Sequence, residues 1–217
     1  MICGVDEAGR GPVLGPLVVA GVMVGDDGQL VEMGVRDSKQ LSRRRRKELA
    51  ERIVDLAEID VVVIQHNEID EWRGSMSLNL IEARAFASAL NRLRPREAIL
   101  DAADVNPDRF RSTVSSYLSF SLEIICQHKA DEHYPVVSAA SIVAKERRDS
   151  LMERIGEEIG EPVGSGYASD PVTRAFLEKW ISENGDLPPY TRRSWETARR
   201  MLNLARTRRL TEWTDER

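Results

Sequence analysis

Two spacings of apolar residues alternate along the chain. Short apolar or β-branched runs are typical of buried strands, and apolar residues three or four positions apart are typical of helices that bury one face. The first spacing predicts strands at residues 1–6, 16–24, 59–64, 98–101 and 122–126. The second predicts helices at residues 42–56, 78–93, 106–118, 136–158, 171–183 and 195–210. The alternation indicates an α/β fold.

The order of these elements predicts how the chain is divided. All five strands precede residue 165, so we expect an α/β domain over residues 1–165 and a small helical region over residues 166–217. Only a glycine-rich turn separates the first two strands, which favours an antiparallel start to a mixed five-stranded sheet flanked by helices. The chain contains no internal repeat and no low-complexity tract.

Composition narrows the class of protein. The 217 residues are 41% hydrophobic, enough for a normal core. No apolar run approaches the about 18 residues that a membrane span needs, and no basic region precedes an apolar stretch at the N-terminus. Cys3 and Cys126 lie in apolar, strand-like segments, which predicts two buried reduced thiols. We therefore expect a cytoplasmic protein without a membrane partner.

The charge balance argues against one broad class of function. The net charge is −5, from 31 basic and 36 acidic residues, whereas a general nucleic-acid coat protein shows a basic excess. An enzyme with a local basic groove remains compatible with this balance. We interpret the run Arg43–Arg46 as a solvated face. The arginines of the last predicted helix could track a nucleic-acid backbone or pair with acids of that helix.

Acidic residues follow three of the predicted strands. Asp6 and Glu7 end the first strand, Asp101 ends the fourth, and Asp131 follows the fifth. Mg²⁺ and Mn²⁺ prefer such oxygen ligands, and two such ions about 4 Å apart can activate water and stabilise a leaving oxygen in phosphodiester cleavage. Any single acid could instead be a solvated strand end or a helix cap, and Asp104 could be exposed or a cap. Together they predict a two-metal site.

A glycine-rich turn follows the first acids. Gly9 and Gly11 remove side chains, so a ligand can approach the backbone, and Arg10 offers a planar fork for phosphate. The spacing up to Gly15 differs from the dinucleotide-binding pattern, and the turn leads into a strand rather than a helix. A predicted metal site, a backbone that a ligand can approach closely and an arginine suited to phosphate occur together here. This combination favours nucleic-acid or nucleotide chemistry.

Ordered segments from residue 4 to about residue 197 resemble the motifs of type 2 ribonucleases H, the ribonuclease HII family. The segments are Gly4-Val5-Asp6-Glu7-Ala8-Gly9-Arg10-Gly11-Pro12, Asp37-Ser38-Lys39-Gln40-Leu41, Asp101-Ala102-Ala103-Asp104-Val105 (in its archaeal form), residues 128–131 with 134–145, residues 164–171 and residues 192–197. The resemblance implies an RNase H-like fold. It also implies cleavage of RNA in RNA–DNA hybrids and on the 5′ side of single ribonucleotides in duplex DNA, leaving 3′-hydroxyl and 5′-phosphate ends.

The resemblance also implies roles for individual residues. The metal ligands, which are not nucleophiles, would be Asp6, Glu7, Asp101 and Asp131. The backbone of Gly9-Arg10-Gly11 would meet the ribose 2′-hydroxyl, the group that separates RNA from DNA. Tyr167 would stack on the sugar at the ribonucleotide–deoxyribonucleotide junction. Lys39 and Lys145 would hold phosphates. The sequence does not choose between Mg²⁺ and Mn²⁺.

The C-terminal residues indicate whether the chain is expected to bind a sliding clamp. Some archaeal relatives end in a glutamine-rich, aromatic segment that binds a sliding clamp. This chain ends Leu210-Thr211-Glu212-Trp213-Thr214-Asp215-Glu216-Arg217, without a paired aromatic. We therefore do not expect docking to a sliding clamp. The chain lacks an obvious apolar stripe, so a monomer is the expected state.

Three alternative functions stay open at this point. A junction resolvase of the same fold would cut DNA alone, although Gly9-Arg10-Gly11 and Tyr167 suit a ribose junction. A nucleic-acid-binding protein with a decayed site would bind without cutting, although the acid set is complete. An actin-like ATPase could also combine a strand-end aspartate with a glycine turn, and it would turn over ATP.

Overall fold

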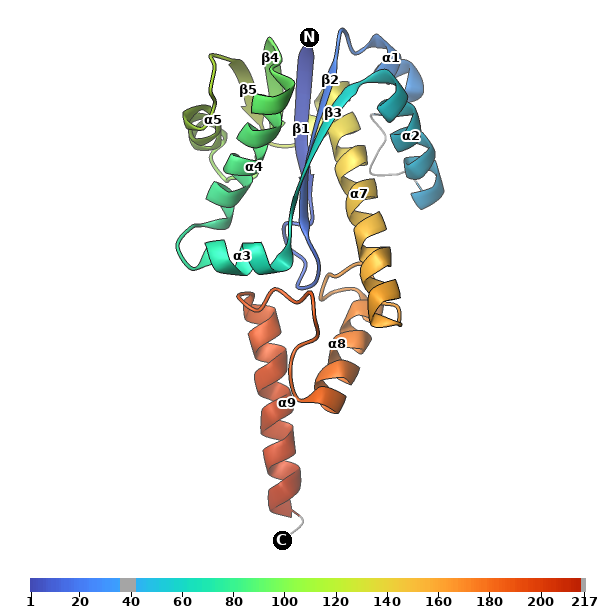
Figure 1. The fold of residues 1–217 in the computed structure, drawn as a ribbon, viewed down its shortest axis with the longest axis vertical. Coiled ribbons are helices and arrows are strands. Elements are labelled where there is room, and N and C mark those ends of the chain that lie inside the picture. The colour runs from blue at the N-terminus through green and yellow to red at the C-terminus, as the bar shows by residue number, and fades with distance from the viewer. Residues whose placement is uncertain (36–41, 216–217) are drawn as a thin grey trace. The chain divides into compact units, whose positions relative to one another are not determined.

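The strands form one mixed sheet in the computed structural model, which describes residues 1–35 and 42–215, with the backbone alone at 208–215. The strands are β1 (Ile2–Ala8), β2 (Leu17–Val24), β3 (Glu58–Ile64), β4 (Glu97–Asp101) and β5 (Glu123–Gln127). Their order in the sheet is β3-β2-β1-β4-β5 (Figure 1). β1 is antiparallel to β2, whereas β1, β4 and β5 run parallel to one another. The predicted mixed five-stranded sheet, including its antiparallel start, is confirmed.

The helices include all those that apolar periodicity predicts. They are α1 (Gly28–Met33), α2 (Arg43–Leu56), α3 (His66–Arg73), α4 (Leu78–Leu93), α5 (Pro107–Ser116), α6 (Ala130–His133), α7 (Pro135–Ile159), α8 (Pro171–Asn184) and α9 (Glu196–Asp215). The sequence did not predict α1, α3 and α6. Each has eight residues or fewer, too short for an apolar repeat to be visible.

Internal contacts divide the chain into two compact units. The first, which we call the sheet unit, comprises residues 1–8, 17–63 and 76–148. The second, which we call the helical unit, comprises residues 9–16, 64–75 and the chain from residue 149 onward. The helical unit therefore includes the glycine-rich loop that follows β1. The domain boundary expected at residue 165 stays a prediction.

Two helices cover opposite faces of the sheet unit. A Cβ on Gly21 would meet Ala89 and Leu93 of α4, and a Cβ on Gly4 would lie 2.3 Å from the carbonyl oxygen of Val136 in α7. Because only glycine permits that second approach, the first turn of α7 packs directly on the backbone of β1. This packing fixes α7 against the strand that carries the first acids.

The helical unit has an apolar core of its own. The loop after β1 contributes to it, as do the end of α7, α8 and the start of α9. The buried members are Val13, Leu14, Met152, Ile155, Val163, Phe176, Leu177, Ile181, Leu187 and Ala198. The glycine-rich loop is thus anchored by its own apolar residues.

Helix length and hydropathy bear on membrane insertion. Across the residues that the structure describes, no helix combines the length and apolar character needed to cross a bilayer.

Candidate metal centre

Three carboxylates gather at one end of the parallel strands. Asp6 lies near the end of β1, Asp101 ends β4, and Asp131 lies in α6, which follows β5. One oxygen from each lies within 4.8 Å of the others. Asp6 and Asp131 are buried and Asp101 is half-buried. The structure therefore brings together three of the four acids that the sequence singles out.

Burial and mutual repulsion disfavour the charged forms of these acids. Burial raises the pKa of Asp6, which a hydrogen bond from Ser141 and the charge of Lys145 oppose. Burial, then the charges of Asp6 and Asp131, raise the pKa of Asp101 to about 6. A divalent cation would relieve this repulsion, and a set of carboxylate oxygens is the donor set that Mg²⁺ and Mn²⁺ take. The residues present fit such an ion.

Backbone amides and a helix hold two of the acids in place. The amide of Lys129 donates to Oδ1 of Asp101 over 2.9 Å. Lys129 has a left-handed backbone (φ 57°), an uncommon conformation for a residue other than glycine, and it directs this amide at the carboxylate. The hydroxyl of Ser138 in α7 donates to the backbone carbonyl of Asp131. Asp101 and Asp131 are therefore positioned by the chain itself.

The third acid is held from α7. Nζ of Lys145 donates to Oγ of Ser141 over 2.8 Å, and the hydroxyl of Ser141 is hydrogen bonded to Asp6. Ser141 and Lys145 are four residues apart and so share one face of the helix. The sequence analysis does not identify Ser141 as a residue that holds Asp6. Its spacing of four residues from Lys145 is the signal that could have indicated it. Lys145 lies beside the acids, and its contact with phosphate stays a prediction.

Glu7 lies on the other face of β1. Successive strand residues point to opposite faces, so Asp6 shares the α7 face with Gly4 whereas Glu7 shares the α4 face with Val5. The amide of Glu7 donates to Oδ1 of Asp6 over 2.7 Å. Glu7 is not among the three acids that gather, and its role as a ligand stays a prediction.

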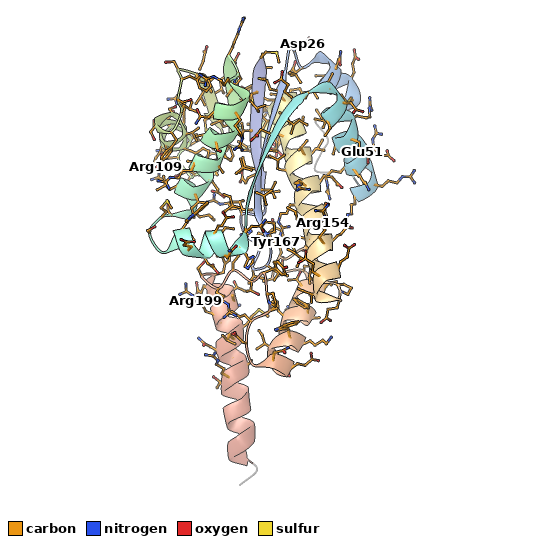
Figure 2. The ribbon with its side chains drawn as sticks, in the orientation of Figure 1. Asp26, Glu51, Arg109, Arg154, Tyr167 and Arg199 are labelled. Atoms are coloured by element: carbon orange, nitrogen blue, oxygen red, sulfur yellow. The ribbon has the colours of Figure 1, made fainter. Side chains whose placement is uncertain are left out.

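Asp104 is an anchor for the start of α5. It is buried and accepts hydrogen bonds from Nδ2 of Asn79 (2.7 Å), the amide of Asn106 (3.0 Å) and Nε of Arg109 (3.0 Å). The Arg109 guanidinium, labelled in Figure 2, holds the pKa of Asp104 well below its usual range. These contacts occupy the Asp104 carboxylate, and Asp104 is not among the three gathered acids.

The predicted ribose-contacting residues lie together in the helical unit. A Cβ on Gly11 would lie 3.7 Å from Cε1 of Tyr167, so the tyrosine ring lies beside this glycine. Tyr167 is 40% exposed, and it is labelled in Figure 2. The amides of Val13 and Leu14 donate to the carbonyl of Gly166 over 2.9 and 3.2 Å. The loop after β1 and the loop that carries Tyr167 are therefore joined.

The sequence left open whether several basic residues contact nucleic acid or are solvated or paired with acids, and the structure shows the contacts of some of them. Arg44 and Arg45 are exposed and pair with Glu48, which supports the solvated-face interpretation for these two residues. Arg46 is half-buried and lies 3.9 Å from a carboxylate oxygen of Glu146, so the interpretation is wrong for that residue. Arg199 of α9 donates to the backbone carbonyls of Arg193 and Ser194. Lys39, with its motif at residues 37–41, lies outside the described residues, as do the side chains of residues 208 and 209.

A mixed five-stranded sheet with three carboxylates at the ends of its parallel strands defines an RNase H-like fold with a candidate metal centre. A sequence model of the Ribonuclease HII family matches residues 3–198, and the chain belongs to that family. It is therefore a ribonuclease H, a hydrolase that acts on RNA–DNA hybrids.

Individual relatives agree with this assignment. A Ribonuclease HII of Methanoregula boonei is 49% identical over 202 residues, which cover 93% of this chain and 94% of that protein. The crystal structure of ribonuclease H2 from Pyrococcus horikoshii superposes with a TM-score of 0.87 at 43% identity, covering 94% and 98% of the two chains. The RNase HII of the PCNA:RNase HII complex from Archaeoglobus fulgidus gives 0.86 at 42% identity, covering 93% and 96%.

Proposed function

We propose that this ribonuclease cleaves the RNA strand of hybrids and also the 5′ side of single ribonucleotides embedded in duplex DNA. Hydrolysis would use two metal ions and leave 3′-hydroxyl and 5′-phosphate ends. The observation that carries the proposal is the gathering of Asp6, Asp101 and Asp131, with oxygens within 4.8 Å of one another. Membership of the family and the ordered motifs support the choice of substrate.

The acids would serve as metal ligands rather than as nucleophiles. Asp6, Asp101 and Asp131 would hold Mg²⁺ or Mn²⁺, with Glu7 as a further ligand reached from the end of β1. The bound ions supply activation of water and stabilisation of the leaving oxygen. Lys129 keeps the Asp101 carboxylate aimed at the cluster through its amide. Ser141 holds Asp6 and Ser138 holds the backbone of Asp131 in the same way, so these three acids are positioned before an ion binds.

Recognition of ribose would belong to the helical unit. The backbone of Gly9-Arg10-Gly11 would contact the 2′-hydroxyl, and Tyr167 would stack on the sugar at the junction. The contact between Gly11 and Tyr167 supports a shared task for the two loops. Lys39 and Lys145 would contact phosphates. We also propose that the C-terminal region, residues 166–217, contributes to substrate binding.

We place this activity in the cytoplasm, in DNA replication and repair, with the enzyme as a monomer. Cys3 and Cys126 are free thiols, as a reducing compartment would keep them. Cys3 is buried as predicted, whereas Cys126 is half-buried, so the prediction of a buried thiol is wrong for Cys126. Burial raises the pKa of both to about 12, so neither is a reactive thiolate. That this chain does not dock to a clamp stays a prediction, to be tested with PCNA because the Archaeoglobus fulgidus relative was solved in complex with PCNA.

Three labelled duplexes test the proposed function. One is an RNA–DNA hybrid, one is DNA with a single ribonucleotide, and one is DNA alone. Each is incubated with Mg²⁺, Mn²⁺ or chelator, and the cut site and end groups are mapped. We expect metal-dependent cleavage of the first two, with the second cut on the 5′ side of the ribonucleotide. Equal cutting of the DNA control would contradict the proposed choice of substrate and favour a resolvase.

A further inference from the structure

A buried arginine from the C-terminal part of the chain holds the glycine-rich loop. Arg192 has no exposed surface. Its Nε donates to the carbonyl of Gly15 over 2.9 Å, Nη2 to Gly9 over 2.6 Å, and Nη1 to Arg10 over 3.1 Å. Its own amide donates to the carbonyl of Val13 over 2.8 Å. One residue therefore joins both ends of the loop.

The geometry of the guanidinium allows Arg192 to bond to three carbonyls of the loop at once. Its donors lie in a rigid planar fork, and a cationic donor forms stronger hydrogen bonds than a neutral one. Gly9 (φ 92°) and Gly15 (φ 87°), at the two ends of the loop, have left-handed backbones that side chains rarely adopt. A loop with such ends has many alternative conformations, and the three bonds from Arg192 select one.

Fixing these carbonyls also fixes the amides that follow them. The described chain has no cis peptide bonds, so each carbonyl and the next N–H point in opposite directions. Holding the Gly9 carbonyl orients the amide of Arg10, and holding the Arg10 carbonyl orients the amide of Gly11. Both amides are thereby directed away from the guanidinium. These are the backbone groups of the segment that the proposed function assigns to the ribose.

We infer that Arg192 is a positioning residue for ribose recognition. It sets the conformation in which the Gly9-Arg10-Gly11 backbone meets the 2′-hydroxyl, and it acts through the loop without touching the substrate. This inference rests on the proposed function, which assigns that contact to the loop. It adds Arg192 to the proposed function as a residue on which the selectivity of the loop for RNA over DNA depends.

The segment around Arg192 is itself held in place. The Arg192 guanidinium lies 4.9 Å from the centre of the Trp195 ring. The carboxylate of Asp70 in α3 accepts hydrogen bonds from the amides of Arg193 (2.6 Å) and Ser194 (2.9 Å) and from the Ser194 hydroxyl (2.5 Å). α3 thus fixes the turn from which Arg192 reaches the loop.

The test replaces Arg192 with lysine and compares binding to two duplexes. Lysine keeps the charge but has a single nitrogen, which cannot reach three separate carbonyls in the fork geometry. The matched control is Arg193→Lys, because Arg193 is exposed and bonds to Asp186 and the Leu187 carbonyl instead. Affinity is measured in chelator, which prevents turnover, for DNA with one ribonucleotide and for the same duplex without it.

We expect the wild type and R193K to prefer the ribonucleotide-containing duplex. In R192K we expect the ratio of the two affinities to fall about tenfold relative to the wild type. Its affinity for the duplex of DNA alone should stay within about twofold of the wild-type value. A merely structural defect would weaken both affinities together. Retention of the full preference by R192K would overturn the inference and leave the proposed function intact. Absence of the preference in the wild type would overturn the assignment of ribose contact to the loop, and the inference with it.

A second variant keeps the inference testable if R192K does not fold. Asp70→Ala removes the three bonds to the turn at residues 193–194 without touching Arg192 or the loop. We expect it to reduce the preference about threefold and to speed hydrogen exchange at the amides of Val13, Leu14 and Gly15. Faster exchange at these amides with an unchanged preference for the ribonucleotide would contradict the inference.

Discussion

At the scale of single residues, the candidate site is a set of charges held against their own repulsion. Burial raises the pKa of Asp6 and Asp101, and Asp131 adds its charge to both. The fold maintains this arrangement with the Lys129 amide on Asp101 and with Ser141 on Asp6. Such an arrangement is unfavourable by itself and becomes favourable when a cation binds.

Asp101→Asn tests the role of the half-buried acid. The amide keeps the size of the side chain and removes the charge that a divalent ion needs, so we expect cleavage to fall at least about 10³-fold with the fold retained. The measurement is the initial rate on an RNA–DNA hybrid, with circular dichroism as the check on folding. Asp108→Asn, an exposed acid on α5, is the matched control and should cleave at the wild-type rate. A wild-type rate in D101N would remove Asp101 from the mechanism.

The same carboxylate predicts how stability without metal depends on pH. The pKa of Asp101 is raised to about 6 in the folded state, against about 3.9 when unfolded. The folded protein therefore binds the proton more tightly, and metal-free stability should fall as pH rises from about 4 to about 6.

Urea unfolding in chelator across that pH range measures the effect. D101N should show a smaller fall than the wild type and be more stable at pH 7 by about 1 kcal/mol, after discounting for the partial exposure of Asp101. An identical pH dependence in both proteins would show that this carboxylate is not strained in the metal-free state.

At the scale of elements, the central contact is between α7 and β1. α7 carries Ser138, Ser141 and Lys145 towards the acids, and its first turn reaches β1 because Gly4 has no side chain. The acids and the residues that hold them thus depend on one close approach between a helix and a strand.

Gly4→Ala tests this approach. Its Cβ would lie 2.3 Å from the carbonyl oxygen of Val136, a backbone atom that cannot move without shifting the helix. We expect a loss of about 3 kcal/mol in the free energy of unfolding, measured with urea. Gly25→Ala is the control, since a Cβ there meets nothing within 4 Å. Equal stability of the two variants would show that α7 does not depend on this glycine.

The sequence predicts elements better than it predicts which residues meet. Apolar spacing identifies every strand and each of the longer helices, because it reflects burial of one face. It does not contain the order of strands in the sheet, which places β1 beside β4 and β4 beside β5. It also treats Asp6 and Glu7 as one pair, although alternation along a strand sends them to opposite faces. The bond from Arg192 to Gly9 joins residues 183 positions apart, and no local pattern predicts it.

At the scale of the whole molecule, two tasks fall in two units of the chain. The sheet unit holds Asp6, Asp101 and Asp131, and the helical unit holds the Gly9–Gly15 loop with Tyr167 and Arg192. In the sequence the loop follows β1 directly, so the strand that supplies the first acid continues into the segment assigned to ribose. Metal binding and ribose recognition should therefore be separable by mutation.

The central claim is that Asp6, Asp101 and Asp131 form a metal centre. The most direct measurement is an anomalous difference map from crystals soaked in Mn²⁺, with crystals in chelator as the control. We expect a peak within coordination distance, about 2.2 Å, of oxygens from all three carboxylates. A map with its manganese peaks elsewhere, and none between these carboxylates, would contradict the account.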